Sequence, residues 1–89
     1  MRGPNHATQV ARFLSRRVLD ELGALQSSVQ ELAVQRNTAL RIFVASRHAA
    51  TALAQRDFWL EFAWADQEYR VAVHRLAQFC ADHRAASRR

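Results

Sequence analysis

The sequence has very few of the residues that interrupt or cross-link a chain. Its 89 residues include one proline, Pro4, two glycines, Gly3 and Gly23, and one cysteine, Cys80. A single cysteine cannot form an internal disulfide, which argues against a secreted disulfide-rich scaffold. Sheet proteins need many more turn residues than this, so the scarcity of glycine and proline excludes most β-sheet folds.

Lysine and long apolar runs are also missing. The chain has no run of about 18 apolar residues, and its N-terminus lacks the uninterrupted apolar core of a signal peptide. We therefore expect an intracellular, cytoplasmic protein without a membrane span. The composition is 49% hydrophobic and 24% charged, with a net charge of +5. This is a globular composition, and its abundant alanine, leucine, glutamine and arginine are good helix formers.

Apolar residues recur at steps of three and four over the first half of the chain. At about 100° per residue they fall within a sector of about 80°, which predicts one amphipathic helix with Asn5 as its N-cap. Ser28 and Glu31 match a capping box and favour a new helix near Ser28, but the phase of the pattern continues unbroken through Gly23. The stripe consists of Leu14, Val18, Leu22, Leu25, Val29, Leu32, Arg36, Leu40 and Phe43.

The second half of the chain shows the same stepping from Trp59 onward. Steps of three and four alternate strictly here, which is the a/d pattern of a coiled-coil seam. Asp57 is placed to cap this helix, and residues 48–56 before it contain no strong turn residue. The predicted seam consists of Trp59, Phe62, Asp66, Tyr69, Val73, Leu76, Cys80 and His83.

The two predicted helices can cover each other's stripes as an antiparallel hairpin. Each stripe contains one charged residue, and facing Arg36 with Asp66 pairs these charges and centres the turn near Thr51. Alternatively, Arg36 extends to solvent and Asp66 pairs with Arg70. We expect an all-α fold, either a long antiparallel helical hairpin or a small two- to three-helix bundle, with a coiled-coil-like seam and an oligomeric state.

Two rival arrangements keep the same stripes. A three-helix fold would break near Asn37 and Asp57, and a single very long helix could dimerise instead of folding back. In each case residues 1–89 form one domain, and we expect residues 1–5 and 85–89 to fray at its ends.

The aromatic segment 58–64 is apolar on two sides of its helix. Leu60, Trp64 and Val71 form a second stripe roughly opposite the seam, which a hairpin cannot cover. A third helix, another copy of the chain or a different helical protein has to cover it, and tryptophan is enriched at protein interfaces. We therefore predict a non-enzymatic protein-interaction module or small structural subunit. Its predicted partner interface consists of Phe58, Trp59, Leu60, Trp64 and Val71.

Residues that could carry chemistry are few. Cys80 and His83 lie three residues apart on one helix face, but two ligands are too few for a metal site. The sequence has no glycine-rich phosphate loop and no nucleophile elbow. A small helical enzyme would need a cationic pocket, for which Arg36, Arg47 and Glu61 have no distinctive spacing. We expect no catalytic residue, no metal and no cofactor.

Arginines gather toward both ends of the chain, which a hairpin would bring together. Such a cluster could contact phosphates, so a small basic nucleic-acid-associated protein is the alternative function. Asp20, Glu21 and Asp82 share the same region and weaken this interpretation, and no recognition motif supports it. The candidate phosphate contacts are Arg12, Arg16, Arg17, Arg84 and Arg88.

Overall fold

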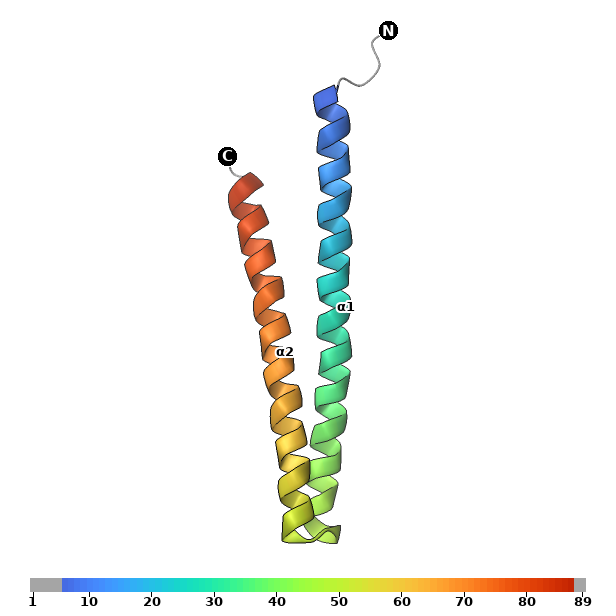
Figure 1. Ribbon diagram of the computed structural model, residues 1–89, viewed down its shortest axis with the longest axis vertical. Helices are drawn as coiled ribbons and strands as arrows, with labels where there is room; N and C mark the ends of the chain where they lie inside the picture. Colours follow the sequence, from blue (N-terminus) through green and yellow to red (C-terminus); the bar gives the residue numbers. More distant parts are fainter. Residues whose placement is uncertain (1–5, 88–89) are drawn as a thin grey trace.

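The protein folds as two long antiparallel helices joined by a tight turn. The computed structural model describes residues 6–87 and, among these, the side chains of residues 15–84. Helix α1 spans His6–Ala49 and helix α2 spans Ala52–Ser87, and the two lie side by side (Figure 1). The molecule is a rod with extents of 75 × 23 × 12 Å. The predicted all-α helical hairpin is confirmed.

The ends of the helices bear on two further expectations. Helix α2 continues to Ser87, which lies within the segment 85–89 that we expected to fray. Residues 1–5 and 88–89 lie outside the described part of the chain. Within that part, neither helix is long and apolar enough to cross a membrane.

The chain reverses at Ala50 and Thr51. The Ala50 N–H donates to the Ser46 carbonyl at 3.0 Å, which closes the last turn of α1. Thr51 then caps α2, because its hydroxyl accepts the Ala54 N–H at 3.2 Å and its carbonyl accepts the Gln55 N–H at 2.9 Å. Threonine is a favourable N-cap residue, so Thr51 is the local signal for the start of α2. The turn predicted near Thr51 is confirmed.

Helix α1 continues through both positions where the sequence offers an interruption. Gly23 is helical and exposed, and the capping-box pair Ser28 and Glu31 lies inside the helix. Helix α2 begins upstream of Asp57, so the prediction that Asp57 caps it is wrong. The physical reason is that Thr51 provides a cap directly where α1 ends, which leaves no room for a third helix between them.

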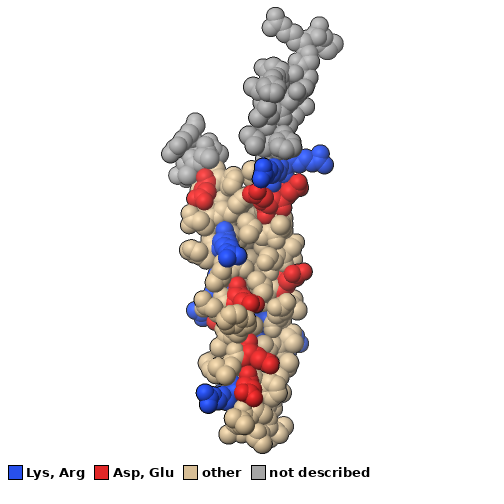
Figure 2. Space-filling model, viewed as in Figure 1, with Lys and Arg blue, Asp and Glu red and all other residues tan. Residues whose placement is uncertain are grey.

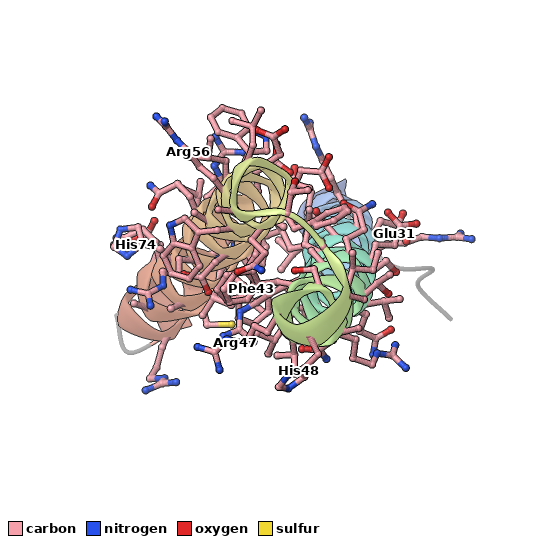
Figure 3. All side chains as sticks on the ribbon, turned by 90° about the horizontal axis from the view of Figure 1, so that it is seen from below. Glu31, Phe43, Arg47, His48, Arg56 and His74 are labelled. Carbon is pink, nitrogen blue, oxygen red and sulfur yellow. The ribbon has the colours of Figure 1, made fainter. Side chains whose placement is uncertain are left out.

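The face of α1 that meets α2 is the predicted stripe. Phe43 lies between the two helices near the turn (Figure 3), and its ring packs on Trp59 with centroids 5.4 Å apart. Every other member with a described side chain is half-buried, while most residues between them are exposed. Leu14 lies outside the described side chains, and the half-buried members are Val18, Leu22, Leu25, Val29, Leu32, Arg36 and Leu40.

The face of α2 that meets α1 is rotated from the predicted seam. Val73 and His83 are exposed, which corrects their placement in the seam, and Trp59 lies at its edge. Ala72 is buried instead, because small side chains let two helix axes approach closely. A pattern built on large apolar residues gives such alanines too little weight. The observed face consists of Ala54, Phe58, Phe62, Ala65, Asp66, Tyr69, Ala72, Leu76 and Cys80.

The interior of the hairpin is thin. Among the residues whose side chains are described, only Ser46 and Ala72 are buried, and no large side chain is fully buried. Each helix is covered on one side only, by the other helix, so most apolar side chains between the helices remain partly in contact with water. The chain exposes 7536 Å², whereas a compact monomer of this length exposes about 5,300 Å². The hairpin alone therefore leaves an unusually large surface in water.

Gly23 gives a direct test of the continuous α1 helix. A methyl group added at Gly23 meets no atom within 4 Å, so alanine fits there without strain. We predict that Gly23→Ala raises the free energy of unfolding by about 0.5–1 kcal/mol, because glycine loses more conformational freedom in a helix than alanine does. Thermal unfolding followed by circular dichroism measures the change.

The matched control for this substitution is the reverse change at the neighbouring exposed position. Ala24→Gly should lower the free energy of unfolding by a similar amount. A Gly23→Ala chain that is no more stable than the original would contradict a helix that is continuous at this position.

Candidate functional site

The middle of the helix seam contains a cluster of three charges. The Arg36 Nε–H donates to Asp66 Oδ1 at 2.6 Å, and Arg70 Nε lies 2.8 Å from Asp66 Oδ2. The Arg36 and Asp66 side chains are 31% and 18% exposed, so this pair is partly withdrawn from water. The structure thus brings the predicted register pair together, and Asp66 also makes the alternative pair with Arg70.

Aromatic rings complete the surroundings of Arg36. Its guanidinium carbon lies 5.5 Å from the centroid of Phe62 and 5.7 Å from that of Tyr69. Both distances are within the range of cation–π attraction. The carboxylate and the rings together occupy the guanidinium, so the cluster holds the helices together and does not form a binding pocket.

The same contacts shift the protonation of Asp66. The hydrogen bond from Arg36 lowers the pKa of the Asp66 carboxyl below its ordinary value of 3.8, and the charges of Arg70 and Arg36 act in the same direction. Partial removal from water opposes this shift but does not reverse it. Asp66 therefore stays ionised at neutral pH, as its pairing with two arginines requires.

An open groove lies beside the seam, with walls from both helices. Its volume is about 490 Å³, and its apolar walls include Leu25 and Leu32 from α1 and Trp64 and Val71 from α2. Trp64 is 68% exposed, although tryptophan is highly buried on average in folded proteins. The other lining residues are Ser28, Gln67, Glu68, Ala72 and Arg75. The groove is thus largely apolar and carries one acidic and one basic side chain.

The structure divides the predicted partner interface into two parts. Trp64 and Val71 line the groove, and Leu60, which is 53% exposed, lies on the same side of α2 without lining it. Phe58 is half-buried on the face toward α1. Trp59 packs against aromatic rings of both helices, at centroid distances of 5.4 and 5.7 Å. Phe58 and Trp59 therefore serve the hairpin itself.

Two members of the second apolar stripe, Trp64 and Val71, lie at the groove beside the helix seam and not opposite the seam. We placed the stripe opposite the seam because the predicted seam used the large apolar residues of α2, whereas the observed seam is rotated toward Ala72. This rotation brings Trp64 and Val71 next to Leu25 and Leu32, which the sequence pattern assigned to the seam alone.

Leu53 is a member of the stripe that our sequence analysis missed. It is exposed and lies seven residues before Leu60, so it falls on the same side of α2. The spacing of seven was available as a signal in the sequence. A helix that begins at Asp57, as the sequence analysis predicts, does not include Leu53, so the prediction omits this residue from the stripe.

The pair Cys80 and His83 has a local structural explanation. Cys80 is half-buried, and His83 is exposed with Nδ1 lying 2.9 Å from the Phe79 carbonyl oxygen. The His83 and Phe79 rings pack with centroids 4.1 Å apart. Within the described residues, no group of three or more His, Cys, Asp or Glu side chains could hold a metal ion.

The arginines near the chain ends lie on a surface of mixed charge. Arg17 Nε is 3.6 Å from Glu21 Oε1, with both side chains exposed. Figure 2 shows basic and acidic side chains next to each other at this end of the rod. Arg16 and Arg84 are exposed as well, and contact of these residues with phosphate stays a prediction. The predicted phosphate contacts outside the described side chains are Arg12 and Arg88.

Comparison with known proteins assigns no family to this geometry. The chain matches no protein-family model, no curated protein and no solved structure.

The ion pair in the seam predicts a specific pH dependence of stability. Because the folded-state pKa of Asp66 is below 3.8, its contribution is fully present above that value and is lost as the pH falls through the folded pKa. We predict that Asp66→Asn is less stable than the original chain at neutral pH, and that the difference shrinks as the pH falls below about 4. Urea unfolding at a series of pH values measures both.

The control is an exposed carboxylate that forms no ion pair among the described residues. Glu61→Gln should change the free energy of unfolding little, and by an amount that hardly varies with pH. A difference between Asp66→Asn and the original chain that persists undiminished in acid would contradict the role assigned to the ion pair.

Proposed function

We propose that this chain is a non-enzymatic protein-interaction module, or a small structural subunit of a larger assembly, that receives a helix of another polypeptide in the groove between α1 and α2. The observation that carries the proposal is the position of Trp64. Its side chain is 68% exposed and forms one wall of an open apolar groove. Tryptophan is enriched among the residues that dominate binding energy at interfaces, which supports a docking role for it.

The shape of the groove favours a helix as its occupant. Two antiparallel helices side by side offer the kind of surface on which further helices pack in bundles, at axis distances of about 8–10 Å. Leu53, Leu60, Trp64 and Val71 extend this surface along α2. The distance from Leu53 to Val71 is about 27 Å along the helix, which corresponds to about five turns of a partner helix.

The thin interior of the hairpin gives the docking an energetic basis. Leu25 and Leu32 are only half-buried between α1 and α2, and a docked helix would remove more of their surface from water. Docking would then also stabilise the hairpin, because a partner that binds only the folded chain shifts the folding equilibrium. Binding and folding are therefore coupled in this proposal.

Trp64→Ala tests the proposal. We predict that it weakens association by about 2 kcal/mol or more, as expected for an interface hot spot, which corresponds to about a 30-fold loss of affinity. The association is that of the chain with itself and with any protein that co-purifies with it, measured by sedimentation equilibrium. Helix content at concentrations below the dissociation constant should be unchanged.

The matched control removes an equally exposed apolar side chain elsewhere. Leu19 is 66% exposed on α1 and does not line the groove, so Leu19→Ala should leave association unchanged. If Trp64→Ala instead lowered the helix content of the isolated chain, Trp64 would belong to an internal core and the proposal would fail.

A further inference from the structure

Two oppositely charged side chains of α2, Glu68 and Arg75, line the groove and form no ion pair within the described part of the chain. They are seven residues apart, which is about 10.5 Å along the helix and too far for direct pairing. The residues three and four positions away from each of them on α2 carry no charge.

We infer that the occupant of the groove is a second copy of this chain, related to the first by a two-fold axis that runs perpendicular to α2 and passes beside it, level with the midpoint between Val71 and Ala72. This inference rests on the proposed function and names the partner for it. An axis perpendicular to α2 reverses the helix, so residues equally far from the axis on either side exchange places. Glu68 then faces the second copy's Arg75, and Arg75 faces the second copy's Glu68.

This exchange makes the groove side of α2 self-complementary, which a symmetric dimer requires. In a two-fold contact the same surface is used by both copies, so every residue on it must match the residue across the axis. The midpoint between Glu68 and Arg75 falls between Val71 and Ala72, where α2 carries only apolar side chains. Two charge pairs would thus flank an apolar centre, and the chain itself supplies both members of each pair.

The same placement covers most of the exposed apolar stripe. Val71 lies next to the axis, and the second α2 runs antiparallel past Trp64 and on toward Leu60. Leu25 and Leu32 form the opposite wall of the groove on α1. Two hairpins joined in this way form a four-helix arrangement, in which each α2 packs against its own α1 and against the other α2.

The surface area also fits a second copy. The chain exposes 7536 Å², about 2,200 Å² more than a compact monomer of its length. Stable homodimers commonly bury about 1,000–2,500 Å² per copy. With this axis the second α2, which ends at Ser87, reaches position 56 and so covers the groove and Leu60 but not Leu53.

Reciprocal charge reversal tests the pairing directly. Sedimentation equilibrium should show that the original chain is a dimer. Glu68→Arg and Arg75→Glu should each weaken dimerisation by about tenfold or more, because each places like charges opposite one another twice. Circular dichroism should show unchanged helix content. An equimolar mixture of the two variants should form a one-to-one heterodimer, since both charge pairs are then opposite again.

Arg41→Glu is the matched control for Arg75→Glu, because it makes the same change of net charge at an exposed position of α1 that does not line the groove. It should leave dimerisation unchanged. Variants that dimerise as tightly as the original chain, or a mixture that forms no heterodimer, would overturn the inference.

A helical chain that stays monomeric at every concentration also overturns the inference, and the emission of Trp64 then separates it from the proposed function. Trp59→Phe leaves Trp64 as the single reporter. Emission typical of an indole in water would show an open groove, so the docking function would stand with a different partner. Emission typical of a buried indole in a monomer would overturn both.

Discussion

The ion pair between Arg36 and Asp66 determines how the two helices meet. Heptad-like stripes are degenerate, since sliding one helix past the other by seven residues again places apolar side chains against apolar side chains. Such a slide moves the two charges about 10 Å apart. It would leave Arg36 partly withdrawn from water without its carboxylate and would leave Asp66 with Arg70 alone, which is unfavourable. The turn at Thr51, the contact of Phe43 with Trp59 and the position of the groove all belong to this one register.

The second constraint is the small amount of surface that two helices can bury. Ser46 and Ala72 are the buried residues within the described side chains, and larger apolar residues on the shared face stay half-exposed. Close packing at Ala72 turns α2 so that Trp64 and Val71 come to the edge of the seam. The groove is therefore a consequence of how the hairpin packs, and a helix docked there would enlarge a core that the hairpin leaves incomplete.

Three charged residues of α2 differ in whether they lie in the helix seam or in the groove. Asp66 lies in the seam, where two arginines neutralise it within the chain. Glu68 and Arg75 lie in the groove, where their charges have no such counterpart among the described residues. A difference of two positions along α2 thus separates an acid paired within the fold from an acid that we propose pairs with a second copy of the chain.

The sequence by itself determined the helical character of both halves of the chain and their apolar stripes, because helical periodicity is a local feature. It offered the turn near Thr51 and the pairing of Arg36 with Asp66 as one of several arrangements, and the tertiary structure selected that arrangement. It also identified Trp64 and Val71 as apolar residues that the hairpin does not bury. Tertiary structure alone decided the rotation of α2 toward Ala72, and with it the groove between Trp64 and Leu25. That rotation depends on how closely two helix axes approach, which the side chains of both helices decide together.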